Sequence, residues 1–420
     1  MLTELELENF KAVKRASISL GRITVLIGEN GSGKSSFLQA LTLLKQSLGK
    51  AHLEVSGTKI ELGSIRDILH FGDARNRIGI RLRVLGPLSE ADQVLGDVVD
   101  ATYAVIFDQQ NISSHSLEVA TPFELEASVV RGSASITPEH VPLPKGVSAT
   151  FQGANRIAEP LGIAKIANGV GREDAAKFNI AVQEVLSAVR SVLLNTYYVP
   201  PVRGIESSSY AQEQQATEDF AGGLPKQASS ILSTLTYDKE LEAEISRLSE
   251  LVLDLKIRTR AIPGTLIVAE THNGHAVNVV NEGYGLNQLL HLLAQVSVSK
   301  NNALLCIEEP EIHLHPAAQA ALAGVLAELT ENDQRQFLIT THSEHILLAL
   351  LTYFGGRGSA AEHLQVYYFT RDKQTHVASA ERLAVDKRGR IKGGLKGFFE
   401  ANVAELGDYL KALSHETDTE

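Results

Sequence analysis

The chain has 420 residues and a mass of 45.4 kDa, a length that predicts two or three packed units. Acidic residues outnumber basic ones 50 to 39 and give a formal net charge of −11, which excludes a uniformly basic nucleic-acid-binding protein. The single cysteine, Cys306, excludes an intramolecular disulfide and a zinc site made of several cysteines. No signal-peptide pattern opens the sequence, and the longest apolar run near its C-terminal end, residues 346–354, is about half a membrane span. We therefore expect a cytoplasmic protein without a membrane segment.

The first 50 residues predict a strand, a second strand, a buried strand and a helix. Leu5 and Leu7 alternate with glutamates, which indicates a half-buried strand, and Ile18 and Leu20 suggest the next one. The continuous apolar run at 23–27 is typical of a strand that is covered on both faces. A glycine-rich segment follows, and then apolar residues recur with helical spacing. These apolar residues are Phe37, Leu41, Leu44 and Leu48.

The middle of the chain changes from strands to helices. Residues 55–160 read as short strands broken by turn residues, which predicts an antiparallel sheet. Residues 172–194 carry a helical apolar stripe, and residues 204–223 read as a mobile loop. The helical spacing at 241–255 covers about two heptads, too short for a coiled-coil arm.

The last third alternates strands with helices and predicts a mainly parallel sheet with helices on its faces. The expected strands are 303–307 and 337–341, the expected helices are 316–329 and 345–353, and a terminal hairpin is expected at 364–369 and 377–380.

Residues 28–35 match the pattern G-x-x-x-x-G-K-[ST] at every fixed position, between a buried strand and an amphipathic helix. In such a loop, backbone N–H groups and the helix N-terminus bind phosphate oxygens. Lys34 would contact the β- and γ-phosphates of ATP, and the Ser35 hydroxyl would bind Mg²⁺. The alternative, a chance glycine-rich turn, does not explain the strand and helix on either side. The expected nucleotide-binding residues are Gly28, Glu29, Asn30, Gly31, Ser32, Gly33, Lys34, Ser35 and Ser36.

Two adjacent glutamates follow the buried strand at 303–307. Because neighbouring side chains on a strand point to opposite faces, Glu308 and Glu309 can have different tasks. We expect Glu308 to hold Mg²⁺ and Glu309 to deprotonate the attacking water; the alternative is two solvated acids at a strand end. His342 ends the next buried strand and could donate a hydrogen bond to the γ-phosphate or the water. With the carboxylates already assigned to phosphate chemistry, we do not expect a zinc or iron site from the histidines at 313–345.

A second glycine turn, residues 281–288, is expected to open a helix at 289–296. Glycines and amide side chains at a helix N-terminus can bind an anion, here the γ-phosphate held by a second copy of the chain. Two ATP molecules would then lie in a homodimer interface. The alternative is a capped helix start. The residues expected to act in trans are Gly283, Gly285, Asn287 and Gln288.

Taken in this order, the motifs resemble the ABC-class (AAA) ATPase heads of the SMC/RecF/OLD group, and in particular the OLD-like branch. The resemblance rests on both ends of the chain and is poor at about 90–200. The segments that carry it are Asn9-Phe10-Lys11, Gly283-Tyr284-Gly285, residues 308–316, Thr341-His342-Ser343 and Gly397-Phe398-Phe399-Glu400, in addition to the phosphate loop.

The resemblance implies a role for each matching residue. Glu308 takes the Walker B position, where most of the group has Asp, and Glu309 takes that of the catalytic base. His342 takes the position of the switch histidine. Gly285, Asn287 and Gln288 take the signature that acts in trans, in which the group usually has Ser at position 287, and His315 takes the loop that crosses the dimer interface. Arg203 looks like a family element, and an exposed structural arginine is an equal alternative.

The resemblance also suggests binding partners for the chain. It predicts a stand-alone ATPase, because neither coiled-coil arms nor a Toprim nuclease domain fits into the sequence. Such proteins are similar to the ATPase subunits of bacterial anti-phage systems of the Septu and PARIS type, so an effector or nuclease partner is expected. DNA could bind the basic stretch 382–396, which is otherwise a solvated hairpin.

We therefore expect an α/β P-loop NTPase with an ABC-type head. Residues 1–160 would form an N-terminal ATPase lobe with the antiparallel sheet, 161–262 a helical insertion, and 263–420 a C-terminal ATPase lobe. The expected function is Mg²⁺-dependent ATP hydrolysis at a dimer interface that controls a partner in anti-phage defence or DNA maintenance. The alternatives are a nucleotide-gated scaffold with little turnover and a P-loop kinase of small molecules.

Overall fold

The structure is a computed structural model. It describes residues 1–87, 98–121, 124–130, 133–140, 149–152, 156–158, 162–166, 172–204, 231, 235–262, 264–270 and 274–394.

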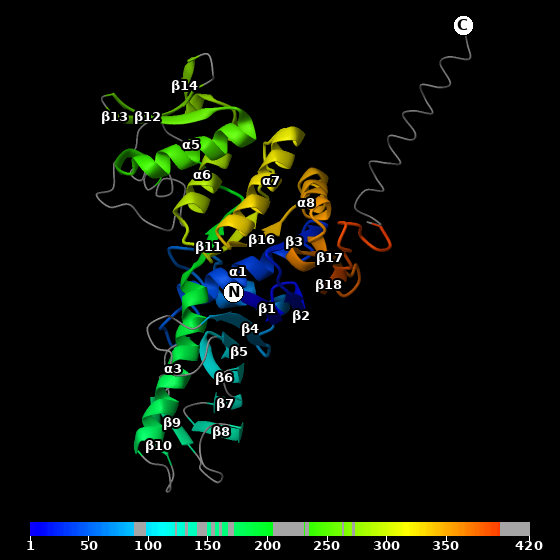
Figure 1. The fold of residues 1–420 in the computed structure, drawn as a ribbon. Helices are drawn as coiled ribbons and strands as arrows, with labels where there is room; N and C mark the ends of the chain where they lie inside the picture. Colours follow the sequence, from blue (N-terminus) through cyan, green and yellow to red (C-terminus); the bar gives the residue numbers. More distant parts are fainter. Residues whose placement is uncertain are drawn as a thin grey trace, which may run out of the picture.

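A six-stranded sheet occupies the centre of the molecule (Figure 1). The five strands from β11 to β17 are parallel to one another, and β18 pairs antiparallel with β17 at the edge. All carboxyl ends of the parallel strands therefore lie at one edge of this sheet, where α/β proteins bind their ligands. In spatial order the strands are β11 (Thr196–Val199), β15 (Leu304–Glu308), β16 (Gln336–Thr340), β3 (Ile23–Gly28), β17 (Leu364–Arg371) and β18 (Ala378–Leu383).

Helices cover both faces of the central sheet. Four helices lie above it in Figure 1, and α1 (Lys34–Gln46) lies on the opposite face, between the central sheet and a second sheet. The four upper helices are α5 (Lys239–Leu253), α6 (Tyr284–Val298), α7 (Pro316–Asn332) and α8 (Glu344–Gly356).

The second sheet is antiparallel and has seven strands. Helix α3 (Arg172–Leu194) runs along it (Figure 1). Its strands in spatial order are β2 (Val13–Ser19), β1 (Leu2–Phe10), β4 (Arg77–Pro87), β5 (Val98–Asp108), β6 (Asn111–Thr121), β7 (Glu124–Val130) and β8 (Ser133–His140). The smaller elements are α2 (Ile65–Ile68), α9 (Ala360–His363), the pair β9 (Ala149–Gln152) and β10 (Gly162–Ile166), and the sheet of β12 (Lys256–Ile262), β13 (Gly264–Glu270) and β14 (Ala276–Asn278).

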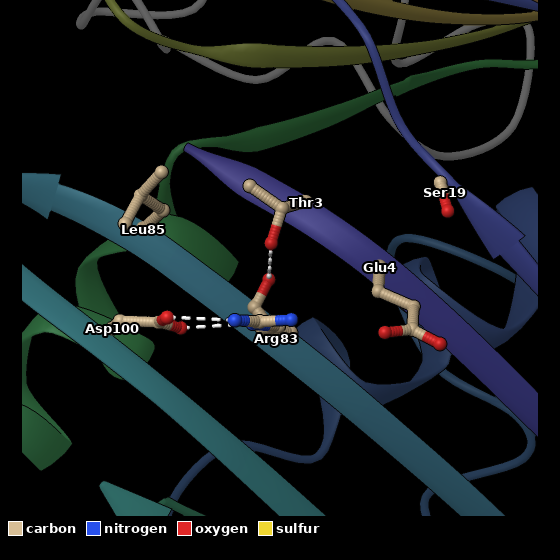
Figure 2. A pocket seen from close by; sticks show the side chains of 6 residues that line it. All are labelled: Thr3, Glu4, Ser19, Arg83, Leu85 and Asp100. Atoms are coloured by element: carbon tan, nitrogen blue, oxygen red, sulfur yellow. Dashed lines mark hydrogen bonds and ion pairs between the residues drawn. The ribbon is translucent and has the colours of Figure 1, made fainter. Parts of the chain in front are cut away.

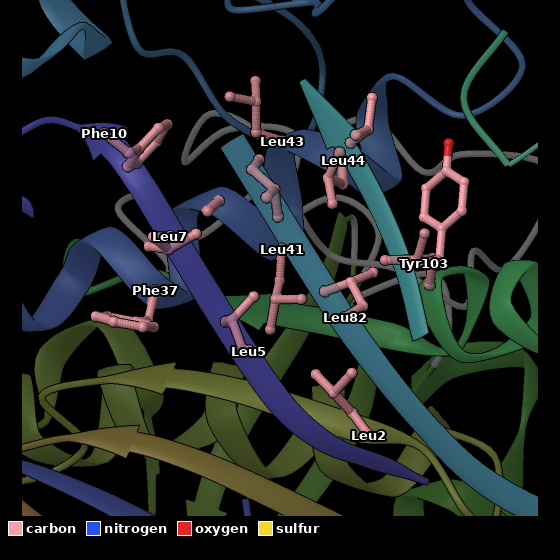
Figure 3. Packing of buried hydrophobic residues seen from close by; sticks show 14 of the residues in the cluster. Leu2, Leu5, Leu7, Phe10, Phe37, Leu41, Leu43, Leu44, Leu82 and Tyr103 are labelled. Carbon is pink, nitrogen blue, oxygen red and sulfur yellow. The ribbon is translucent and has the colours of Figure 1, made fainter. Parts of the chain in front are cut away.

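Alternation along the strands produces two apolar cores. On β3, Leu26 faces the core around α1, whereas Val25 and Ile27 face the core under the four helices. Helix α1 contributes Phe37 and Leu41 to the first core, and Figure 3 shows both beside leucines of β1 and β4. One helix therefore packs against both sheets, and the phosphate loop at its N-terminus is fixed from both sides.

Most sequence-based expectations for the elements agree with the structure, including the α/β class. The terminal hairpin is confirmed as β17 and β18, and β17 also pairs with β3 in the central sheet. Two expectations differ. The segment 161–262, expected to be helical, also contains β10, β11 and β12, of which β11 belongs to the central sheet. Helix α6 begins at Tyr284, five residues before the expected start, because residues 279–281 turn the chain ahead of it.

Some expectations fall outside the described residues. These are most of the loop at 204–223 and the motif at 397–400. The bounds of the three expected domains stay predictions. Within the part of the chain that is described, no helix combines the length and apolarity needed to cross a membrane.

The shared core gives a stability prediction. Phe37 is fully buried and meets the ring of Phe369 edge-on, with ring centroids 5.6 Å apart. Phe37→Ala removes this packing between the sheets, so the free energy of unfolding in denaturant should fall by about 3–5 kcal/mol. The matched control is Phe71→Ala, because Phe71 is 58% exposed and its removal should change stability by no more than about 0.5 kcal/mol. Equal losses in the two variants would contradict the packing described for α1.

Candidate nucleotide-binding site

The expected phosphate loop joins the end of β3 to the start of α1. Gly28 has φ 136°, and a Cβ added there would lie 2.1 Å from the carbonyl oxygen of Phe369, so only glycine fits. Gly33, the N-cap of α1, has φ 99°, and this left-handed turn leads the chain into the helix. The first N–H groups of α1 and the positive end of its dipole therefore lie at the loop. The Oγ atom of Ser32 is buried without a hydrogen-bond partner among the described residues, which is consistent with a polar ligand in this loop.

The other expected loop residues divide into exposed and buried ones. Glu29, Asn30 and Gly31 are exposed at the tip, whereas Ser36 is buried at the start of α1. Lys34 is buried too, and its Nζ donates hydrogen bonds to the carbonyl oxygens of Gly28 and Glu29 at 2.8 and 2.7 Å. Both acceptors belong to its own loop, so the ammonium group stands at the site where phosphate is expected.

Lys34 also lies among carboxylates. Burial lowers the pKa of Lys34, and nearby negative charges oppose that shift. The carboxylates responsible are Glu309, Glu311, Glu308 and Glu29, in decreasing order of effect. The loop and the acidic end of β15 therefore meet at one edge of the central sheet, as the sequence predicted.

Glu308 ends β15 and is held by hydrogen bonds from three directions. Its Oε1 accepts from the Tyr198 hydroxyl at 2.7 Å and from Nε2 of Gln39 at 3.2 Å, and the Ser35 side chain also hydrogen-bonds this carboxylate. Burial raises the pKa of Glu308, and these hydrogen bonds offset part of the effect. A serine hydroxyl and a carboxylate in contact form the oxygen pair that Mg²⁺ uses in sites completed by phosphates and water. The donor set fits Mg²⁺.

Glu309 has a strained backbone. Its φ of 45° lies in the left-handed region, and its N–H donates to the carbonyl oxygen of Thr340 at 2.9 Å. The side chain is half-buried and contributes to the negative field around Lys34 and His342. The hydrogen bond to Thr340 ties the chain after β15 to the end of β16, so the expected base lies beside the segment that carries the expected switch histidine.

Glu311 is a third acid at this edge. Its Oε1 accepts a hydrogen bond from the backbone N–H of His342 at 2.7 Å, and its Oε2 is buried without a partner among the described residues. Burial raises the pKa of Glu311, opposed by this hydrogen bond. Glu311 therefore fixes the main chain at the expected switch histidine.

His342 follows β16 with an exposed side chain. Burial of part of the ring and the positive charge of Lys34 lower its pKa, although Glu309 acts in the opposite sense. The imidazole is therefore neutral near pH 7 and carries one N–H donor. Because the charges of Lys34 and Glu309 both act on the ring, His342 lies near these two expected site residues.

Arg203, left open between a family element and an exposed structural arginine, is not exposed. Only 4% of its surface is accessible, and burial lowers its pKa to about 10. Its Nη1 and Nη2 donate to the carbonyl oxygens of Glu308 and Glu309 at 2.9 and 3.2 Å. The guanidinium therefore lies directly behind the expected Walker B pair.

The second glycine turn has a different local structure from the one expected. Gly283 is the N-cap of α6, and Asn287 and Gln288 lie inside the helix. Asn287 is only 8% exposed, so in the single chain its side chain is not presented to a second copy. A Cβ at Gly285 would lie 2.5 Å from the carbonyl oxygen of His313, so this turn packs closely on the segment after β15. Asn281, Gly283 and Tyr284 are exposed in this turn, and Tyr284 has 73% of its surface accessible.

The histidines near the site make local contacts. His315 is exposed and is the N-cap of α7, where its Nδ1 accepts from the backbone N–H of Ala317 at 3.3 Å. The ring of His313 packs against that of Tyr284, with centroids 5.6 Å apart. Among the residues that the structure describes, no three His, Cys, Asp or Glu side chains gather as a metal site.

A hollow on the outer face of the antiparallel sheet lies apart from this site (Figure 2). Its volume is about 180 Å³, and it is crossed by an ion pair in which Nη2 of Arg83 lies 2.7 Å from Asp100. Oγ1 of Thr3 donates to the backbone carbonyl of Arg83 at 3.1 Å. These polar groups already have partners, so the hollow is not a second candidate site.

Three residues at the site were not predicted from the sequence as functional, and Arg203 was left between two interpretations. Tyr198 and Gln39 contact Glu308, Glu311 binds the backbone at His342, and Arg203 lies behind the expected Walker B peptide. The helical spacing of Ser35 and Gln39, four residues apart, was a usable signal for Gln39.

A protein-family model described as an AAA ATPase domain matches residues 1–91 and 177–347, more than half of the chain. The chain belongs to this family. It therefore carries an ATPase domain, and membership implies that it binds ATP.

Among curated proteins, this AAA ATPase-domain protein is distantly similar to two nucleases. The Old nuclease of Escherichia phage P2 is 23% identical over 371 residues, which cover 83% of this chain and 57% of that protein. The OLD nuclease of Thermus scotoductus is 22% identical over 362 residues, which cover 82% of this chain and 59% of that protein. The chain thus spans less than two thirds of the length of either relative.

Among solved structures, the chain is similar to SMC head domains. An SMC head bound to the C-terminal winged-helix domain of ScpA has 13% identity and a TM-score of 0.48, covering 91% of this chain and 98% of that one. The SMC head of Thermotoga maritima has 12% identity and a TM-score of 0.41, covering 91% and 99%.

The burial of Glu311 gives a prediction for stability against pH. Because its pKa is raised in the folded protein above the ordinary 4.5, the folded state holds the proton to higher pH than the unfolded chain. The free energy of unfolding should therefore fall as pH rises from about 4.5 through the folded pKa, by about 1.4 kcal/mol for each unit between the two values. Glu311→Gln should remove this loss and be more stable than the wild type at pH 7.

The measurement is denaturant unfolding between pH 4 and pH 8, with Glu362→Gln as the control because Glu362 is exposed. If the wild type and Glu311→Gln change in parallel over this range, the position of Glu311 in the structure is wrong.

Proposed function

We propose that the protein is a Mg²⁺-dependent ATPase that hydrolyses ATP at a homodimer interface and thereby controls an effector or nuclease partner. The observation that carries the proposal is the contact of Ser35 with Glu308, beside Lys34 and below the N-terminus of α1. A phosphate-binding loop and a metal-binding carboxylate meet there at the carboxyl edge of a parallel sheet. The expected nucleotide-binding residues, 28–36, surround this point.

Each side chain would have a distinct task. Lys34 would exchange its two loop carbonyls for phosphate oxygens, and Ser35 with Glu308 would hold Mg²⁺. When bound, Mg²⁺ would neutralise charge on the β- and γ-phosphates. Glu309 would accept the proton of the attacking water, and neutral His342 would donate a hydrogen bond to the γ-phosphate or the water.

The turn at the start of α6 would complete the site of a second copy. Gly283 and Tyr284 are exposed there, and the helix N-terminus directs N–H groups and a positive dipole towards solvent. Asn287 and Gln288 would position this turn from within the helix, and His315 would lie in the crossing loop. Such an arrangement gives two sites across a two-fold axis.

The role in phage defence or DNA maintenance is proposed from the resemblance of the motifs to the OLD-like branch; the two curated relatives are named OLD nucleases. The exposed basic residues Arg382, Lys387, Arg388, Arg390 and Lys392 are available to DNA or to an acidic partner.

The first test separates a turning-over ATPase from a nucleotide-gated scaffold. Glu309→Gln removes the proposed base, so the ATP turnover number should fall by roughly 10²-fold or more while ATP remains bound. The control is Glu328→Gln, an exposed position on α7 that should turn over like the wild type. Equal turnover in Glu309→Gln and wild type would exclude Glu309 as the base, and a slow wild type would favour the scaffold.

The second test addresses the dimer. In sedimentation velocity with ATP and Mg²⁺, Glu309→Gln should change from monomer to dimer, because it binds ATP and hydrolyses it slowly. Lys34→Ala is the matched control: it loses the phosphate-binding ammonium, so it should neither bind ATP nor change its mass with ATP. The dimer proposal would fail if the mass of Glu309→Gln did not depend on ATP.

A further inference from the structure

Arg203 joins three separate segments of the chain behind the carboxylates. Nη1 donates to the carbonyl oxygens of Pro200 and Glu308 at 2.8 and 2.9 Å, Nη2 donates to that of Glu309 at 3.2 Å, and Nε to that of Gln288 at 3.2 Å. The three segments are the chain after β11, the end of β15 and the first turns of α6. All four acceptors are main-chain atoms, so the guanidinium fixes the course of the backbone rather than one side chain.

The backbone at Glu309 needs such a brace. Its φ of 45° is a left-handed conformation that a glutamate does not adopt without support from its surroundings. Arg203 donates hydrogen bonds to the carbonyl oxygen of Glu309, the strained residue, and to that of Glu308 before it. A planar group with five N–H donors suits several carbonyls at fixed angles, which a lysine ammonium cannot reproduce.

The residue after Arg203 strengthens the connection to α6. Gly204 has φ 129°, and a Cβ there would lie 2.7 Å from Oδ1 of Asn287. The chain at 203–204 therefore lies against two consecutive residues of α6, through the carbonyl of Gln288 and the side chain of Asn287. A displacement of the start of α6 would be transmitted to the chain that leads to Arg203.

We propose that Arg203 is a positioning residue that makes the start of α6 and the Glu308–Glu309 peptide move as one unit. This inference rests on the proposed function. A ligand that binds the exposed N-terminus of α6, here the γ-phosphate held by the second copy, thereby sets the position of the Glu309 carboxylate. Arg203 thereby couples ATP hydrolysis to dimer assembly by connecting two segments of the same chain. Its guanidinium itself contacts neither nucleotide nor water.

The test is a kinetic double-mutant cycle of Arg203→Lys and Glu309→Gln. Arg203→Lys keeps the charge but not the four hydrogen bonds, so the turnover number should fall on the order of 10-fold or more while the dissociation constant for ATP changes little. Because Arg203 acts through Glu309, adding Arg203→Lys to Glu309→Gln should cost almost nothing more. If the two substitutions lower the turnover number independently, so that their effects multiply, the inference is wrong and the proposed ATPase activity still stands. If the wild-type protein does not hydrolyse ATP, both the inference and the proposed function are wrong.

Arg335→Lys is the matched control. Arg335 is also buried, with 7% of its surface accessible, and Nη2 donates to the carbonyl oxygen of Ser299 at 3.1 Å. It precedes β16 and so lies at the opposite end of the central sheet from Glu308. Its replacement should reduce stability without lowering the turnover number of the folded protein.

Amide hydrogen exchange provides a readout that does not depend on turnover. In Arg203→Lys, exchange should become faster both at 284–290 in α6 and at 308–311, whereas Arg335→Lys should leave both segments unchanged. Faster exchange at 308–311 alone, with α6 unaffected, would show that Arg203 supports the peptide without linking it to the helix, and would overturn the coupling. For Arg203→Ala, if it folds, added guanidinium ion should restore part of the lost turnover.

Discussion

The contact between the first turns of α1 and the end of β15 is the interaction on which the site depends. Glu308 accepts hydrogen bonds from Ser35 and Gln39 on the helix and from Tyr198 on the neighbouring strand. Those bonds hold a buried carboxylate beside the proposed phosphate-binding loop, where burial alone would favour its neutral form. The side chain of Glu308, which is longer than that of an aspartate, is thereby held in one orientation. Hydrogen bonds thus connect α1, the carboxylate and the strand edge, and the histidine after β16 is attached to the same edge through Glu311.

Local sequence was sufficient for much of this architecture. Alternation marked β1 and continuous apolar runs marked β3, β15 and β16, because strands covered on both faces leave few other residue types. The phosphate loop was predictable because its glycines have backbone conformations that other residues avoid, as Gly28 and Gly33 do. The meeting of Lys34 with Glu308 and Glu309 followed from parallel strands, whose carboxyl ends share one edge.

What sequence reasoning missed depends on contacts between distant segments. Strand β11 is four residues long, and its place beside β15 is decided by pairing, not by its own pattern. Arg203 carries no local signal of burial, because its acceptors are carbonyl oxygens contributed by three segments. The early start of α6 was missed because glycines at 283 and 285 suggested a turn, whereas packing against His313 stabilises a helix there. The middle of the chain, residues 92–176, lies outside the family match and supplies strands β5 to β10.

The position of β3 has a consequence for biosynthesis. This strand precedes both of its neighbours by more than 300 residues: Ile23 pairs with Phe337 on one side and with Leu364 on the other. Until the ribosome has released that distant part, the apolar run at 23–27 has no neighbours in the sheet, and the loop after it has no fixed shape. Pairing between strands that are so far apart in the sequence forms slowly, and until it forms the apolar segment is exposed to non-native contacts. The loop at 28–33 therefore cannot reach its folded shape before the segment that contains Phe337 and Leu364 has been synthesised.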